Sequence, residues 1–330
     1  MPDSNPKPDL INKMPKEVWV GAFAVLVMGC ILTFFLSETW ATRQDYSFGY
    51  LMPIFALYVI FDRKEKVFAY FSGTAQSSKP KYSLANLIAD TFFGGMLFCG
   101  LAVFFLFAFM LIAAQESGSL AFPITFGFSF SFIAMAYFAA ARKPSTIKER
   151  LGFVCLFIFP AFAWLISAPL FSSVENLISL FLLSKVAKIV YAVMTWLGYV
   201  VELNGNSLTF PNGSVGVADA CSGIRSLTAC LFAGSFLAAV FLDKFWKKVL
   251  LVLVSMCLAF FNNILRALFL SFWAYQNGPE SISGFVHDAA GYFVLGMTVV
   301  GLLVLLPIFQ FSRVPPGFKE ESEDGAANTH

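Results

Sequence analysis

The sequence predicts an all-α membrane protein, a polytopic helical bundle of about eight spans with an interfacial helix and a small extracytoplasmic β-hairpin. Three observations predict this class. Of the 330 residues, 58% are hydrophobic and only 13% are charged, and apolar runs of about twenty residues, the length needed to cross a bilayer, recur along the chain. The 41 phenylalanines are consistent with helices that face lipid.

The apolar runs predict the individual spans. They cover residues 18–36, 46–61, 87–114, 120–141, 151–171, 222–242, 249–275 and 288–310. The second run is short for a bilayer and contains Pro53, so we expect this span to be tilted, broken or longer than its apolar run. The chain start has no cleavable-signal pattern, so the first span is expected to remain in place.

These runs form one unit between two polar ends. Residues 1–17 are expected to be a cytoplasmic tail, 18–311 the membrane domain, and 312–330 a disordered cytoplasmic tail, since Glu320–His330 is acidic and rich in Gly and Ala.

The segment 174–201 is apolar but carries Lys185 and Lys188 in its middle. Charges at the centre of a bilayer are costly, so we expect this segment to lie along the interface. A ninth span is the alternative.

The basic residues predict the orientation. With eight spans, alternate loops and both ends hold 17 of the 22 basic residues, and the opposite loops hold only Arg43 and the interfacial lysine pair. Both termini are therefore expected in the cytoplasm. A ninth span would move Lys244, Lys247 and Lys248 outside, which this distribution opposes.

The outer region 172–220 contains a second structural signal. Residues 201–220 alternate apolar and polar side chains around Asn204-Gly205 and Asn212-Gly213. Such pairs favour tight turns between strands, so a small β-hairpin or meander is expected directly before Cys221.

Cys221 is the one cysteine at a span boundary; the other five fall inside apolar runs, where cysteine usually acts as a small hydrophobe. A cysteine in the first turn of a helix is biased towards the reactive thiolate. Asp219 or Ser222 is a candidate helix cap. A buried structural cysteine is the simpler interpretation of Cys221.

Two arginines and one histidine lie in or beside the later spans. Arg225 and Arg266 are inside apolar runs, where an ionisable group suggests function; Asn262 shares a helix face with Arg266. The predicted orientation places Cys221, Arg266 and His287 at about one depth on the outer side. A snorkelling arginine and an interfacial histidine are the structural explanations.

Together these three residue types suggest acyl transfer from a peptide through a thioester. A thiolate attacks carbonyl carbon, an imidazole transfers protons, and a guanidinium stabilises an oxyanion. No metal or other cofactor is expected, because one candidate histidine and no paired cysteines are present. No phosphate loop, no GxSxG elbow and no basic nucleic-acid stripe appears.

At these residues the sequence resembles the exosortase/archaeosortase family of integral membrane cysteine transpeptidases. The similarity lies in ACSGIRSL at 220–227, NNILRALFL at 262–270, HDAAG at 287–291 and an early segment at 45–64. It implies catalytic roles for Cys221, Arg266 and His287; Asp288 lies next to that histidine. Phe48 stands where many members have histidine. We expect Arg225 to be structural, pairing with Asp219 or a backbone carbonyl, although it competes with Arg266 for the role of catalytic arginine.

The resemblance also implies a substrate. Exported proteins with a short C-terminal motif such as Pro-Glu-Pro, one transmembrane helix and a basic cluster would be its substrates. The enzyme would be a multi-pass protein of the bacterial inner membrane, with its active site facing the periplasm. A lipid or glycan amine, or water, would resolve the thioester. The alternative is a non-enzymatic membrane protein, a transporter or an assembly factor of exopolysaccharide export.

Overall fold

The computed structural model describes residues 14–72, 84–114, 120–216, 224–242 and 244–310. Its elements in chain order are α2 (Lys16–Thr42), η1 (Gln44–Leu51), α3 (Met52–Asp62), α4 (Lys64–Ser72), α5 (Leu84–Ala114), α6 (Ala121–Ala140), α7 (Ile147–Cys155), α8 (Ile158–Ser167), α9 (Ser172–Trp196), β1 (Glu202–Asn204), β2 (Ser207–Phe210), β3 (Gly213–Gly216), α11 (Ile224–Phe241), α12 (Phe245–Asn277), η2 (Pro279–Ile282) and α13 (Phe285–Gln310).

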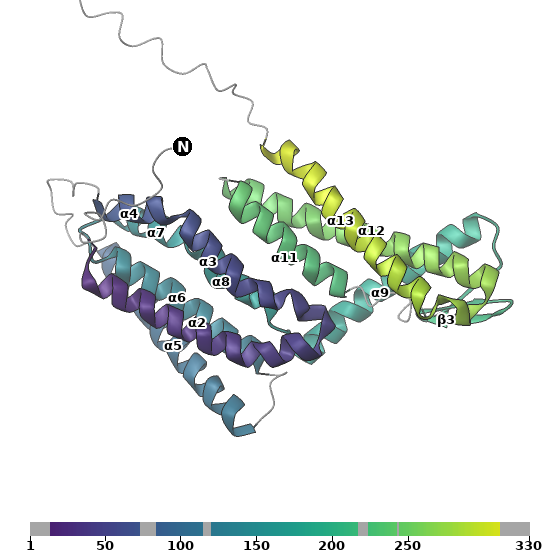
Figure 1. Cartoon of the computed structure of the whole chain (residues 1–330), viewed down its shortest axis with the longest axis horizontal. Helices are drawn as coiled ribbons and strands as arrows, with labels where there is room; N and C mark the ends of the chain where they lie inside the picture. The colour runs from purple at the N-terminus through teal and green to yellow at the C-terminus, as the bar shows by residue number, and fades with distance from the viewer. Residues whose placement is uncertain (1–13, 73–83, 115–119, 217–223, 243, 311–330) are drawn as a thin grey trace, which may run out of the picture.

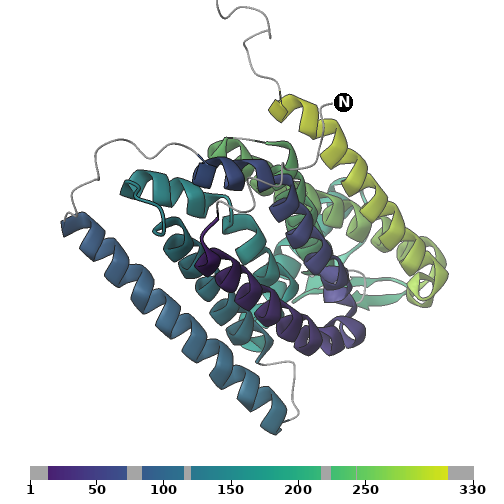
Figure 2. The same ribbon diagram turned by 60° about the vertical axis from the view of Figure 1, so that its left-hand side comes forward.

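The helices form two groups. In Figure 1, α2 to α8 lie on one side, and α9, the strands and α11 to α13 on the other. Figure 2 shows α5 and α13 at opposite edges of the molecule. One hydrophobic cluster joins α2, η1, α3 and α5 to α8; a second joins α9, the strands, η2, α12 and α13. Phe232 of α11 belongs to the first cluster, so α11 contacts both groups.

The predicted fold class is confirmed: the protein is a helical membrane protein with one small sheet. Within the described ranges, α2, α5, α6, α9, α12 and α13 are long and apolar enough to span a bilayer. The bent pair α7–α8 would be a seventh span, and α11 is a shorter apolar helix. The predicted start of the membrane domain, residue 18, is described and lies in α2, whereas its predicted end, residue 311, is not. Of the two predicted tails, 1–17 is described only from residue 14 and 312–330 lies wholly outside the described residues.

Two predicted spans are interrupted. The run 46–61 is the 3-10 helix η1 followed by the 11-residue α3, with Pro53 at the start of α3. The run 151–171 is split into α7 and α8, bent by 41°. Pro160 explains this second break, because its ring excludes a helical hydrogen bond to the carbonyl of Leu156. That carbonyl accepts a hydrogen bond from Nη1 of Arg63 at the end of α3 instead.

The segment with the two central lysines is one helix, α9, which in Figure 1 runs across the direction of α12 and α13. It packs on α12 through a stripe that includes Val186, Val190 and Met194. Lys185 and Lys188 are exposed on the other side. An interfacial position therefore stays a prediction, because the length and composition of α9 also suit a span.

The predicted hairpin is a three-stranded antiparallel meander of order β1-β2-β3. Asn204 pairs with Ser207, and the two-residue turn between them contains Gly205 at φ +65°, a conformation that glycine adopts without strain. The second turn closes with Phe210 paired to Gly213. Leu208 and Val215 point into the core beneath α9 and α12.

Candidate active site

Arg266 and His287 lie together, although 21 positions separate them in the sequence. Arg266 lies on α12 and His287 in the first turn of α13, and these two helices are packed side by side (Figure 1). Nη2 of Arg266 is 3.0 Å from Nε2 of His287, and the same nitrogen donates to the backbone carbonyl of His287 at 3.4 Å. The structure thus brings together two of the three residues expected to be catalytic.

The contact decides which nitrogen of the imidazole carries the proton. A guanidinium has only donors, so Nε2 of His287 must accept and the ring proton is on Nδ1. Nε of Arg266 is buried and has no hydrogen-bond partner in the part of the chain that the structure describes. This donor is available to a bound carbonyl or oxyanion.

Gly284 and Gly291 explain how the first turns of α13 can approach the guanidinium so closely. Gly284, at φ +67°, turns the chain into the helix. Gly291 lies one turn after His287, and a Cβ there would be 3.5 Å from Nη2 of Arg266, so the guanidinium lies against bare backbone. Asp288 is exposed in the first turn of α13, where a carboxylate complements the helix dipole.

A second polar contact joins the same two helices below this pair. Asn262, one turn before Arg266, is 2% exposed and donates through Nδ2 to Oγ1 of Thr298 at 2.8 Å. The Thr298 hydroxyl in turn donates to the carbonyl of Val294. Asn262 therefore links α12 to α13 one turn from Arg266, and its supporting role in the site stays a prediction.

Cys221 and Asp219 lie outside the described residues, so their predicted roles are not tested here. The described part of α11 begins at Ile224, shortly after Cys221 in the sequence. Arg225 is in the first turn of α11, but its side chain is likewise outside the description. The helix itself packs against both α12 and α13, the helices that carry Arg266 and His287.

One polar cluster was not anticipated from the sequence. Glu175, at the start of α9, binds Nη2 of Arg43 at 3.0 Å and the hydroxyl of Tyr46 at 2.6 Å. The signal was present in the sequence: Arg43 is the basic residue of the predicted outer loops apart from the lysine pair, and Glu175 is a lone carboxylate in an apolar segment. We call Arg43, Tyr46 and Glu175 the Glu175 cluster.

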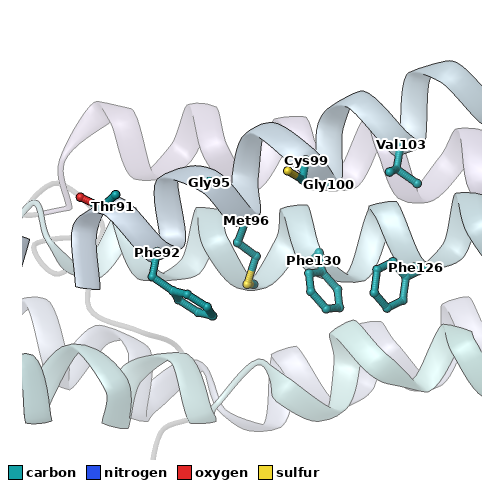
Figure 3. A pocket seen from close by; sticks show the side chains of 9 residues that line it. All are labelled: Thr91, Phe92, Gly95, Met96, Cys99, Gly100, Val103, Phe126 and Phe130. Atoms are coloured by element: carbon teal, nitrogen blue, oxygen red, sulfur yellow. The ribbon is translucent and has the colours of Figure 1, made fainter. Parts of the chain in front are cut away.

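Two apolar grooves lie elsewhere in the described part of the molecule. One of about 440 Å³ runs along α5 and α6, lined by residues including Phe92, Met96, Phe126 and Phe130 (Figure 3). Another of about 620 Å³ lies between α2 and α5. Among the described residues, no group of three His, Cys, Asp or Glu side chains is placed to hold a metal ion.

Comparison with known families assigns the chain. The family model described as transmembrane exosortase (Exosortase_EpsH) matches residues 40–304, well over half of the sequence. The chain belongs to the transmembrane exosortase family. The predicted resemblance is thus confirmed, and membership gives this exosortase a membrane peptidase or transpeptidase role in general terms. No curated protein and no solved structure matched the chain.

Proposed function

We propose that this exosortase is a thiol-dependent membrane peptidase and transpeptidase that cleaves C-terminal sorting tails of exported proteins through a thioester on Cys221. The contact between Nη2 of Arg266 and Nε2 of His287 carries the proposal, since it pairs a permanent cation with a proton-transfer group at one end of α13. Family membership supports the reaction class.

The first half-reaction forms the thioester. The sulfur of Cys221 attacks the scissile carbonyl carbon, and the N–H donors of Arg266 stabilise the oxyanion. In the resting enzyme, Nε2 of His287 accepts a hydrogen bond from Nη2 of Arg266. This N–H group therefore turns to the substrate oxygen before the imidazole ring accepts the thiol proton. The C–N bond then breaks, and the imidazolium gives this proton to the leaving amine.

The second half-reaction releases the processed protein. An amine on a lipid or envelope glycan, or water, attacks the thioester carbonyl, and His287 takes its proton and returns it to the sulfur. The C–S bond breaks and the resting enzyme is restored. The substrate tail combines a short motif, one transmembrane helix and a basic cluster; the helix supplies affinity through apolar contact and the motif sets the register at the periplasmic face.

The decisive experiment uses Cys221→Ala in membranes with a coexpressed exported protein that ends in such a tail. We expect its cleavage to fall by at least about 1,000-fold, since the nucleophile is lost. Cys257→Ala, in the apolar part of α12, is the matched control and should cleave normally. Unchanged cleavage by Cys221→Ala would eliminate the enzyme hypothesis in favour of a non-enzymatic role in export.

A further inference from the structure

Glu175 is a carboxylate buried at the junction of two segments far apart in sequence. It is 8% exposed and accepts hydrogen bonds from Tyr46 in η1 and from Arg43 just before η1. A buried carboxylate is costly unless donors compensate it. Two donors from one short segment therefore fix η1 to the start of α9.

The other side of η1 contacts α11. Oγ1 of Thr228 donates to the backbone carbonyl of Asp45 at 3.3 Å. One turn further along α11, the ring of Phe232 stacks on Phe48, with centroids 5.1 Å apart and planes inclined by 18°. Both contacts lie near the beginning of the described part of α11, which follows Cys221 in the chain.

Other neighbours also hold α11. Ser255 of α12 donates to the backbone carbonyl of Cys230, between Thr228 and Phe232, at 3.3 Å, and further along the helix Arg63 donates to the carbonyl of Ala239 at 3.4 Å. At Gly234 a Cβ would lie 2.7 Å from Cβ of Ser255, so α11 and α12 are in close contact there. The η1 contacts at Thr228 and Phe232 lie before those at Gly234 and Ala239, so their loss would act first on the beginning of the described part of α11.

We propose that the Glu175 cluster holds η1 so that η1 positions the first described turns of α11, which follow Cys221 in the chain, against α12 and α13, the helices that carry Arg266 and His287. Arg43, Tyr46, Glu175 and Thr228 are then positioning residues. This inference rests on the proposed function of Cys221. The inference also gives a role to the early segment at 45–64, since Phe48 of this segment packs against Phe232 of α11.

The test measures the alkylation rate of Cys221 by a membrane-impermeant maleimide, as a function of pH, in full-length protein reconstituted in nanodiscs. The sequence predicts Cys221 in the first turn of a helix, where a thiol is partly thiolate, so its alkylation rate at neutral pH reports its placement. In Tyr46→Phe and Thr228→Val we expect the rate at pH 7 to fall about threefold, while the plateau at high pH stays unchanged. Tail cleavage should lose kcat, by about tenfold, with KM unchanged.

The chain contains a matched control, the Asp90 cluster of Asp90, Tyr137 and Arg150. Tyr137 donates to Asp90 at 2.6 Å and Arg150 contacts the same oxygen at 3.3 Å, at the other end of the helical group. Tyr137→Phe removes a tyrosine hydroxyl that donates to a carboxylate, as Tyr46→Phe does. We expect it to lower the unfolding temperature as Tyr46→Phe does and to leave the alkylation profile unchanged.

Conservative replacement separates position from folding. Thr228→Ser keeps the hydroxyl that donates to Asp45 and should retain the wild-type alkylation profile. If Tyr46→Phe does not fold, the comparison of Thr228→Ser with Thr228→Val decides whether the contact positions Cys221. Wild-type profiles in Tyr46→Phe and Thr228→Val, or an equal shift in Tyr137→Phe, would overturn the positioning role alone. Cleavage by Cys221→Ala would overturn both proposals.

Discussion

At the scale of the residue, Arg266 combines a satisfied and an unsatisfied donor in one side chain. Nη2 reaches His287 from the neighbouring helix, whereas the buried Nε has no partner among the described residues. An unpaired buried donor costs about 1–3 kcal/mol. Such a cost is typical of a group that acts on a ligand, and a peptide carbonyl oxygen is the acceptor that the proposed reaction brings to it.

Replacing Arg266 tests this role. In Arg266→Gln we expect kcat/KM for tail cleavage to fall by at least about 100-fold, because the oxyanion loses its cationic donor. Arg266→Lys keeps the charge but not the planar set of donors and should recover less than about a tenth of the activity. Cleavage of a tail-bearing protein in reconstituted membranes measures both.

Arg225→Gln is the control for this experiment. Arg225 is the other arginine in an apolar run, and we expect its variant to stay within about threefold of wild type. If Arg225→Gln instead abolishes cleavage while Arg266→Gln preserves it, the catalytic arginine is Arg225.

At the scale of the element, the helices follow local sequence, but their interruptions follow from single residues. Runs of apolar side chains predict the long helices, because spanning length and backbone satisfaction within a helix are local properties. The break between α7 and α8 has a local cause too, Pro160. The contact that stabilises this break is not local, because Arg63, from another helix, donates a hydrogen bond to the freed carbonyl of Leu156.

The close approach of α5 and α6 at Gly127 gives a prediction at the scale of the element. At Gly127 an added Cβ would lie 2.6 Å from the backbone nitrogen of Phe104 and 2.8 Å from the carbonyl of Gly100. Backbone atoms cannot move aside as side chains do, so Gly127→Ala should destabilise the protein by about 1–3 kcal/mol. Thermal unfolding in detergent measures the effect.

Gly95→Ala is the matched control in α5, because no atom lies within 4 Å of the added Cβ. Its unfolding temperature should equal or exceed that of wild type, since alanine favours the helix over glycine. Equal losses in both variants would show that close approach at Gly127 is not what stabilises the pair.

At the scale of the whole molecule, α11 connects the two helical groups and the proposed site lies at one end of α12 and α13. Asn262–Thr298 and Arg266–His287 align α12 with α13. Phe232 of α11 packs into the first hydrophobic cluster, and the helix α11 also packs against α12, which belongs to the second group. The arrangement therefore couples the early part of the chain to the site.

Orientation in the membrane is the whole-molecule prediction. Since basic residues favour the cytoplasmic side, a cysteine at exposed Glu202 should react with an impermeant maleimide in intact cells, and one at exposed Lys148 only after permeabilisation. Cys221→Ser is the background for both variants. The opposite labelling pattern would invert the predicted topology and place the site in the cytoplasm.

The sequence by itself determined the class of protein, the family, the apolar helices and the turn at Asn204-Gly205, because hydrophobic runs, motifs and turn residues act over a few neighbouring positions. It also singled out Arg266, because a charged side chain in an apolar run suggests function, and His287, because it is the histidine at the entrance of the last predicted span. Only the tertiary structure decided that these two meet at 3.0 Å and that Glu175 binds Arg43 and Tyr46. Such contacts depend on how helices far apart in the chain pack, and no local pattern contains that information.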